Sequence, residues 1–560
     1  MWSDDDNSGV KETNPVNGAQ PTNPAIPPAT GASPVSRRHF LVGAGAGSVA
    51  AAVGGSLGAA ALTVSPDAEA ASTAPGRGRF RHGVASGDPL TDRVILWTRI
   101  TPKQPRAAAV RWVIARDERL RQVVNEGVVT ALPDRDWTVK VDAEGLQPGV
   151  TYWYRFETSG ERSPVGRTRT LPDDRATRAQ FAVASCSNYP AGLFNAYGRI
   201  AARDNLDAVL HLGDYIYEYA AGGYAENPAL QRQHQPAHEI VTLADYRGRY
   251  AQYRTDPDLQ AAHARHPWIC VWDDHESANN SWRDGAENHQ PEEGAWADRR
   301  AAAVRAWHEW LPVRERPSAD GPHIWRSFRF GTVADLIMLD TRLHGRTEQV
   351  ADRKDASAMA ASGRTILGED QAAWLAEALR ASVRRGAAWH VIGQQLMFGQ
   401  LLDADRVLLN SDMWDGYPAS RQRLLDQLAA ESIQDTVILT GDIHSSWAVD
   451  ITPDPFGAGY DRATGRGALA VELVTTSITS PGPMGSAADI EAREQAIVAS
   501  QPHIHYANLR ERGYLLVDLD ATRARAEWWY VDRIDAPSVA ERLGAAFTTR
   551  RGANHLVRDA

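Results

Sequence analysis

Four short hydrophobic runs in this sequence each end in residues that can bind metal ions. The first run ends at Cys186, and the others end in the segments 213–217, 272–276 and 441–444, which carry carboxyl, phenol and imidazole side chains. In α/β enzymes, a strand that stops at such a residue delivers its side chain to one rim of a sheet. Four endings of this kind predict a polynuclear metal site, and a site of this kind predicts catalysis.

The first predicted metal site mixes soft and hard ligands. Asp214 and Tyr217 leave one run close together, Cys186 adds a thiolate, and His444 adds an imidazole. The thiolate, phenolate and carboxylate together suit a trivalent ion better than zinc or magnesium. Coordination is also what would deprotonate a tyrosine, whose free pKa is about 10. We therefore expect Fe³⁺ at this site.

The second predicted site is rich in oxygen ligands. Asp214 has a second oxygen that can bridge to a neighbouring ion, and Asp274 and Asp442 would complete the set. Hard oxygen ligands favour Ca²⁺, with Mg²⁺ or Mn²⁺ as substitutes. Asp273 is the alternative to Asp274, and the sequence does not decide between them.

Two cations that share a carboxylate activate water and hold a phosphoryl group for in-line displacement. His275 directly follows Asp274 and is not needed as a ligand. It is therefore placed to protonate the leaving oxygen or to neutralise developing charge. We assign Asp274 and His275 to the catalytic group.

From residue 178 onward, apolar strands alternate with helical stretches and later give way to strand-rich sequence. The pattern predicts strands at 180–184, 208–212, 268–272, 334–339, 390–392, 436–439, 469–474, 514–519 and 526–531, and helices at 298–310, 370–383 and 419–430. This order predicts an α/β domain over 178–560 with a mixed sheet or two stacked sheets. We expect His211 in the core. We expect His234, His238, His263 and His266, which lie in polar stretches, at the surface.

Residues 78–172 carry short strands with alternating polarity, at 93–100, 110–116 and 137–141. The segment 146–156 then gives a turn followed by aromatic residues at every second position. That stretch resembles the tyrosine corner of fibronectin type III and immunoglobulin-like sandwiches. We expect a β-sandwich here that serves as a scaffold or lid.

The first 70 residues predict targeting rather than a fold. Residues 1–35 are rich in Pro, Asn, Ser and Gly and are predicted to be disordered. Arg37 and Arg38, a weakly hydrophobic stretch and the small-residue triplet 68–70 together resemble a twin-arginine export signal over 36–70. A membrane anchor is the alternative, but the Ala and Gly content disfavours a stable span. We expect a periplasmic or extracellular protein that begins near Ala71 and uses the twin-arginine machinery.

Composition limits the kinds of binding partner and of cysteine chemistry that we expect. The 560 residues predict two domains, and a net charge of -10 argues against nucleic acid or an anionic membrane surface as the main partner. The two cysteines exclude a disulfide framework. One bridge remains possible by count. Cys186 ends its run, whereas Cys270 precedes the end of its run, so strand rise would separate the sulfurs by roughly 13 Å if both runs end at the same rim. In that arrangement the distance would exclude a bridge.

These motifs together resemble the metallophosphoesterase superfamily, and in particular its PhoD-type alkaline phosphatase and phosphodiesterase branch. The resemblance rests on Gly-Asp-x-x-Tyr at 213–217, Asp-His-Glu at 274–276, Gly-Asp-x-His at 441–444 and Cys186 in place of the first aspartate. It covers essentially the whole mature chain. It implies a two-sheet α/β sandwich flanked by helices, with an all-β sandwich before it. It also implies that the iron ligands are Cys186, Asp214, Tyr217 and His444, and that the calcium ligands are Asp214, Asp274 and Asp442.

Two departures from the wider superfamily concern the second metal. The strand that reaches 393–395 lacks a histidine found in many relatives, and Asp442 stands where relatives often have another. Both changes replace imidazole by oxygen ligands, which favours calcium over zinc.

The resemblance implies an exported phosphohydrolase for phosphate monoesters, diesters or both, acting through in-line attack by a hydroxide held at an Fe(III)/Ca(II) centre. It also implies that Asn279 and Arg300 bind the phosphate, although Arg300 fits the solvated face of a helix equally well. One alternative is a phospholipase D-like phosphodiesterase that acts on phospholipids. The other is a non-catalytic surface or metal-binding protein, which the ligands at all four strand ends disfavour.

Overall fold

The computed structural model describes residues 78–315, 323–403 and 406–560. The predicted disordered region 1–35 and the predicted export signal 36–70 lie outside the described residues. Among the helices of the described part, none is both long enough and apolar enough to cross a bilayer.

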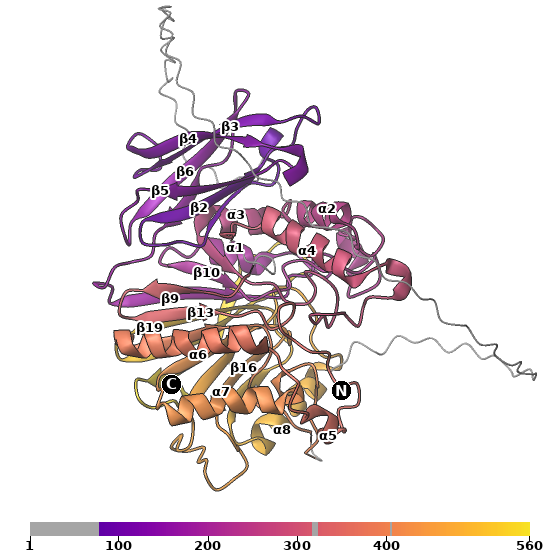
Figure 1. The fold of residues 1–560 in the computed structure, drawn as a ribbon, viewed down its shortest axis with the longest axis vertical. Helices are drawn as coiled ribbons and strands as arrows, with labels where there is room; N and C mark the ends of the chain where they lie inside the picture. The colour runs from indigo at the N-terminus through magenta and orange to yellow at the C-terminus, as the bar shows by residue number, and fades with distance from the viewer. Residues whose placement is uncertain (1–77, 316–322, 404–405) are drawn as a thin grey trace, which may run out of the picture. The chain divides into compact units, whose positions relative to one another are not determined.

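Two large sheets form the centre of the fold (Figure 1). The ten-stranded sheet has the order β22-β21-β20-β19-β9-β10-β11-β1-β2-β5. Its strands are β1 Val84–Gly87, β2 Arg93–Arg99, β5 Thr138–Glu144, β9 Arg178–Ala184, β10 Ala208–His211, β11 Pro267–Cys270, β19 Gly513–Asp520, β20 Arg523–Val531, β21 Glu541–Arg550 and β22 Val557–Arg558. The seven-stranded sheet has the order β12-β13-β14-β15-β17-β16-β18. Its strands are β12 Arg326–Phe330, β13 Ala334–Met338, β14 Trp389–Gly393, β15 Thr436–Thr440, β16 Ser446–Ile451, β17 Ala470–Val474 and β18 Ile504–Asn508.

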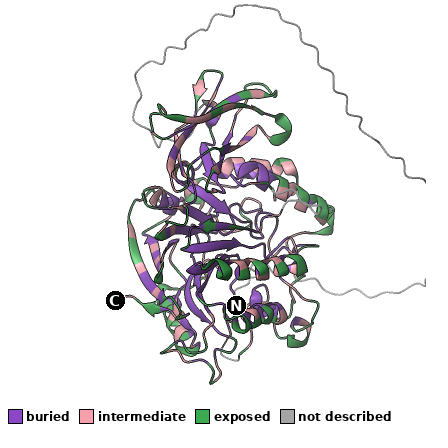
Figure 2. Cartoon of the chain, turned by 60° about the vertical axis from the view of Figure 1, so that its left-hand side comes forward, coloured by how far each residue is buried: buried purple, intermediate pink, exposed green. Residues whose placement is uncertain are grey.

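The inner faces of these sheets share one hydrophobic core. Phe181 of β9 and Phe330 of β12 meet edge to face at 4.8 Å, and the Trp528 indole of β20 donates to the carbonyl of Val474 in β17. The central strands are buried on both faces, which explains why they read as continuous apolar runs (Figure 2).

Helices cover the outer faces. The helices are α1 Asn195–Ala201, α2 Leu243–Tyr253, α3 Pro257–Arg265, α4 Trp296–Trp310, α5 Ala356–Met359, α6 Gly368–Arg385, α7 Pro418–Ala430 and α8 Ala487–Ser500. Apolar side chains of α6 and α7, such as Leu379 and Leu425, pack in one cluster with Ile337 and Ile438 of the seven-stranded sheet. Helices α1 to α4 contribute to the core of the ten-stranded sheet. The prediction of a two-sheet α/β sandwich flanked by helices is therefore confirmed.

The N-terminal β region is built partly on the same large sheet. Strands β3 Ala108–Ala115, β4 Val123–Ala131, β6 Thr151–Thr158, β7 Glu161–Arg162 and β8 Gly166–Arg169 form a separate five-stranded sheet. Strands β1, β2 and β5 instead extend the ten-stranded sheet, where β1 pairs in parallel with β11. A second core lies between them. The Tyr152 hydroxyl accepts a hydrogen bond from the Gln147 backbone N–H at 2.8 Å, as a tyrosine corner does.

Three of the histidine expectations need correction. His211 is buried and His238 is exposed, as predicted, but His234, His263 and His266 are buried as well. His263 stacks on Trp268 at 3.8 Å, and His266 donates from Nε2 to the carbonyl oxygen of Ile200 in α1 at 3.1 Å. The surface prediction was wrong because it used only the polar neighbours in sequence, whereas these histidines are buried by contacts with residues distant in sequence.

Candidate metal centre and active site

The predicted ligands follow the carboxyl ends of parallel strands, and four of them adopt a left-handed backbone. The φ angles are 60° at Cys186, 56° at Asp214, 63° at Asp442 and 53° at His444. This conformation costs an ordinary residue roughly 1–2 kcal/mol. Such strain at several neighbouring positions is typical of functional sites, because the surrounding fold must hold each residue in place.

Gly213 lets two of these strand ends approach. Its φ of 106° disfavours any side chain, and a Cβ at this position would overlap the Cβ of Asp273. The glycine therefore brings the segment carrying Asp214 against the segment carrying Asp273.

One group of ligand atoms matches the predicted iron set. Cys186 Sγ, a carboxylate oxygen of Asp214 and an imidazole nitrogen of His444 all lie within 4.8 Å of one another. The Tyr217 hydroxyl lies 2.9 Å from Asp214 Oδ2 and 3.2 Å from His444 Nε2. His444 Nδ1 lies 2.9 Å from the carbonyl oxygen of Pro481, which can only accept, so Nδ1 carries the proton and Nε2 is free to bind a metal.

The electrostatics of this group also fit a cation. Burial, reinforced by the Asp214 charge, raises the pKa of Cys186 and that of Tyr217 well above their ordinary values. Both groups would therefore keep their protons without a positive charge beside them. Asp214 Oδ1 is buried with no hydrogen-bond partner in the described structure, which is costly unless an ion completes its coordination.

A second group of carboxylates adjoins the first. Oxygen atoms of Asp273, Asp274 and Asp442 lie within 4.8 Å of one another, and a further group joins Asp214, Asp274 and His275. Asp214 thus belongs to both ligand sets, as a bridging carboxylate would. Burial raises the pKa of Asp442 to about 8, and that of Asp273 well above its ordinary range. These carboxylates would ionise together only with added positive charge.

Asp273 and Asp274 differ in how their carboxylate oxygens are hydrogen-bonded. Asp274 Oδ1 accepts from the backbone N–H of His275 at 3.0 Å, and Oδ2 accepts from that of Asn280 at 2.6 Å. Asp273 Oδ1 accepts from Arg342, whereas its buried Oδ2 has no partner in the described structure. Oxygen atoms of both residues belong to the carboxylate group. Of the two residues, Asp273 is the one with a buried oxygen that has no hydrogen-bond partner in the described structure.

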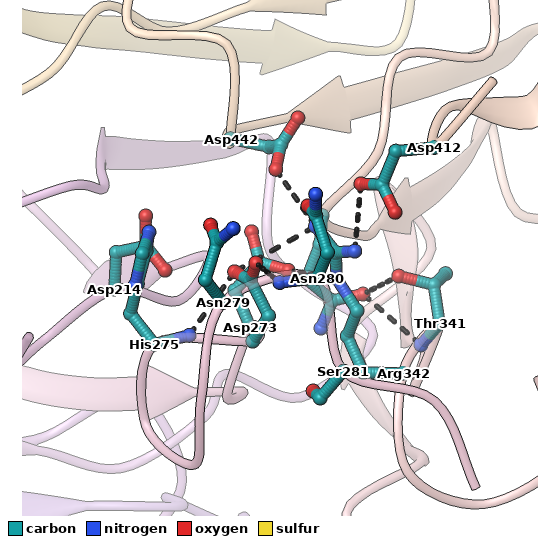
Figure 3. Close-up of polar contacts among 12 residues, drawn as sticks. Asp214, Asp273, His275, Asn279, Asn280, Ser281, Thr341, Arg342, Asp412 and Asp442 are labelled. Carbon is teal, nitrogen blue, oxygen red and sulfur yellow. Dashed lines mark hydrogen bonds and ion pairs between the residues drawn. The ribbon is translucent and has the colours of Figure 1, made fainter. Parts of the chain in front are cut away.

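Arg342 is a site residue whose role the sequence did not reveal. Its buried guanidinium donates to Asp273 at 2.5 Å, to Asp412 at 2.7 Å and to Asp442 at 2.8 Å (Figure 3). Asp412 is held in turn by Arg346 at 2.5 Å. Through these ion pairs, the planar guanidinium of Arg342 links strand ends that belong to the two different sheets. A sequence signal was present, because Asp340-Thr341-Arg342 directly follows the predicted strand at 334–339.

His275 is fixed from two sides. Its Nδ1 lies 2.7 Å from Glu218 Oε2, and its ring lies 4.2 Å from the ring of Tyr217. Burial alone would lower the pKa of His275, but the charges of Asp274, Glu218 and Asp214 raise it well above its ordinary value. With Nδ1–H directed to Glu218, Nε2 is the nitrogen available for proton transfer to a substrate.

Glu276 organises the backbone around these ligands. Its carboxylate accepts from the N–H groups of Asp214 at 3.0 Å, Tyr215 at 2.8 Å and Asp273 at 2.8 Å. It thereby holds the ends of β10 and β11 together, which is how a neighbouring residue sets the position of metal ligands.

The two predicted phosphate-binding residues lie in different places. Asn279 is on the loop that carries Asp273 and His275, and its backbone N–H donates to Glu218 Oε1 at 2.7 Å. Arg300 lies on α4 and lines a cavity of about 620 Å³ together with Trp272, His308 and Asp340. Trp272 directly precedes Asp273, so this cavity adjoins the loop of the carboxylates. The phosphate-binding roles of both residues stay predictions.

A two-sheet α/β sandwich with carboxylates, an imidazole, a phenol and a thiol gathered at one rim defines the metallophosphoesterase class. Family comparison agrees with this class. The model described as "PhoD-like phosphatase" matches residues 181–528, and that of its N-terminal domain matches residues 66–172. The chain belongs to the PhoD-like phosphatase family, which confirms the prediction of a phosphoric ester hydrolase of this type.

Two relatives are similar over most of their length. Alkaline phosphatase D of Bacillus subtilis (strain 168) is 38% identical over 538 residues, which cover 92% of this chain and 88% of that protein. A solved structure described as "Structure of PhoD" superposes with a TM-score of 0.78 at 36% identity, covering 86% of this chain and 92% of the other. The predicted fold and enzyme class are both confirmed by these relatives.

Proposed function

We propose that this chain is an exported hydrolase that cleaves phosphate monoesters, diesters or both at a centre containing Fe³⁺ and Ca²⁺. The observation that carries the proposal is the convergence of Cys186, Asp214 and His444 at the rim, with Asp214 shared by the neighbouring carboxylate group. A relative named alkaline phosphatase D supports the same reaction class.

The candidate ligand atoms on the two sides of Asp214 suit two different metal ions. A thiol, a phenol, a carboxylate and an imidazole suit Fe³⁺. The residues that would hold this ion are Cys186, Asp214, Tyr217 and His444. The all-carboxylate set suits Ca²⁺, with Mg²⁺ or Mn²⁺ as substitutes. Asp214, Asp274 and Asp442 would hold this ion, with Asp273 as the alternative to Asp274.

When bound, the cations would supply activation of the attacking water and neutralisation of the phosphoryl oxygens. His275 would donate a proton from Nε2 to the leaving oxygen, while Glu218 keeps Nδ1–H in place and stabilises the charged ring. The Asn279 amide and the Arg300 guanidinium would donate hydrogen bonds to non-bridging phosphoryl oxygens.

Substrate class is tested by comparing p-nitrophenyl phosphate with bis(p-nitrophenyl) phosphate after reconstitution with iron, with and without added calcium. We expect turnover of at least one ester, and a large loss when calcium is omitted. No turnover of either ester after reconstitution would contradict the proposal. Release of choline from phosphatidylcholine without turnover of either ester would favour the phospholipase D-like alternative.

Export rests on the sequence of 36–70, which lies outside the described residues. The twin-arginine route is tested by replacing Arg37 and Arg38 with lysine and fractionating the cells. We expect the enzyme activity to stay in the cytoplasm in the variant and to leave it in the wild type. Equal export of both proteins would refute this route.

A further inference from the structure

A second cluster of metal-binding side chains lies apart from the active site. It centres on Asp450, whose carboxyl group is fully buried in β16. Asp450 Oδ2 lies 2.6 Å from His555 Nδ1 and 3.0 Å from His505 Nε2, and it accepts from the Tyr460 hydroxyl at 2.9 Å. Strand β16 begins just after His444 and leads away from the rim, and Asp450 lies near its far end.

A β-bulge aims His505 at this carboxylate. In the pairing of β16 with β18, Ala448 faces Tyr506 and Val449 faces Ile504, so His505 is the extra residue between the two pairs. Bulges redirect side chains in this way and often occur beside active sites. The His505 side chain is only 10% exposed. Its Nε2 is buried without a hydrogen-bond partner in the described structure, although it lies 3.0 Å from the Asp450 oxygen.

The third ligand comes from the C-terminal segment. His555 lies between β21 and β22, and the N–H of the next residue, Leu556, donates to Asp450 Oδ1 at 3.0 Å. The loop between β16 and β17 closes over this histidine. Gly465 has a φ of 70°, and a Cβ there would overlap His555. The cluster therefore joins two strands, a loop and the C-terminal segment.

We propose that Asp450, His505 and His555 form a structural site for a divalent transition-metal ion, with Zn²⁺ as the expected occupant. One ligand atom from each residue lies within 4.8 Å of the others. Two imidazoles and one carboxylate are a ligand set that Zn²⁺ prefers, and the Tyr460 hydroxyl or water can take the fourth position. The ion would neutralise the buried carboxylate and clamp the C-terminal segment onto β16 and β18.

A shared proton is the competing occupant. The side-chain hydrogen bond with Asp450 raises the pKa of His555. A protonated His555 would neutralise Asp450 without any metal, but it would give His505 Nε2, 3.0 Å from the same Asp450 oxygen, no part in that neutralisation. A metal ion accounts for both imidazoles together.

The test uses the full chain with its iron and calcium in place, incubated with one equivalent of Zn²⁺ and then freed of unbound metal. Metal analysis is compared for wild type, His505→Gln, His555→Gln and the control His238→Gln, whose exposed imidazole pairs with Asp245. We expect about one zinc per chain in wild type and control, and a loss of most of it in the other two variants. Iron content and turnover of p-nitrophenyl phosphate should not change.

Thermal unfolding gives the second readout. Zinc should raise the Tm of wild type and control by a few degrees, and should not raise that of the two cluster variants. Equal zinc content in all four proteins, or no zinc in wild type, would overturn the proposal. In the latter case, a Tm that depends on pH but not on zinc would identify the proton as the occupant.

Discussion

Arg342 Nη2 donates to Asp442 Oδ1 at 2.8 Å, which links the end of β13 to the end of β15 inside the active site. The same guanidinium reaches Asp273 beyond β11, in the other sheet. Arg342 therefore neutralises carboxylates that would otherwise repel one another, and it does so without occupying all their oxygens.

Replacing Arg342 with glutamine should destabilise the protein by about 3–5 kcal/mol, because it leaves buried carboxylates unpaired. Unfolding by urea measures this difference. Arg380→Gln is the matched control, since Arg380 makes an exposed ion pair with Glu431 and should change stability little. Equal effects of the two substitutions would contradict the role assigned to Arg342.

Gly213→Ala should lower both stability and kcat, because the new Cβ would push Asp273 away from Asp214. Gly222→Ala separates this effect from backbone strain. Gly222 has a φ of 75°, but a Cβ there would meet open space. We expect a cost of about 1 kcal/mol for Gly222→Ala, and a clearly larger cost with a loss of activity for Gly213→Ala. Similar activity in both variants would show that the approach of the two strand ends is not required.

His275→Gln should reduce kcat about 10²- to 10⁴-fold, as expected for loss of a general acid. Glu218→Gln should reduce kcat less, because Glu218 orients His275 and stabilises its charged ring but does not itself transfer the proton. Steady-state kinetics with p-nitrophenyl phosphate distinguish these outcomes. A kcat that is unchanged in His275→Gln would remove this residue from the reaction.

The Asp450–His555 pair predicts a pH dependence of stability in metal-free protein. Burial would raise the pKa of Asp450, but the imidazoles of His505 and His555 lower it, and the hydrogen bond with Asp450 raises the pKa of His555. The Asp450 contribution is present above its unfolded pKa of about 3.9 and is lost as the pH falls through its lower folded value. The His555 contribution is present below about 6.5 and is lost as the pH rises through its higher folded value. The Tm difference between wild type and Asp450→Asn should therefore be largest near pH 5. A difference that does not vary with pH would contradict this coupling.

The sequence predicted the central strands because these are buried on both faces and read as continuous apolar runs. It placed the end of β11 at Trp272, whereas the strand ends at Cys270 and the chain then turns to present Asp273 and Asp274. Strand β16, which begins two residues after the proposed ligand His444, was not predicted.

Arg342 could not be predicted as the centre of the carboxylates, because its partners Asp273, Asp412 and Asp442 are 69, 70 and 100 residues away in sequence. Only the stacking of two sheets brings these strand ends together. The same is true of the Asp450 cluster, whose histidines are supplied by a bulge and by the C-terminal segment. Local patterns identify individual ligands, whereas contacts between sheets decide how the ligands are neutralised.

The visible spectrum of the purified protein tests the central claim most directly. Thiolate and phenolate on Fe³⁺ should give an intense charge-transfer band, and Cys186→Ser and Tyr217→Phe should shift or abolish it together with the activity. Tyr219→Phe, whose ring lies 5.3 Å from that of His275, is the control and should keep the band. A colourless wild-type protein that contains no iron and is fully active would contradict the assigned first metal site.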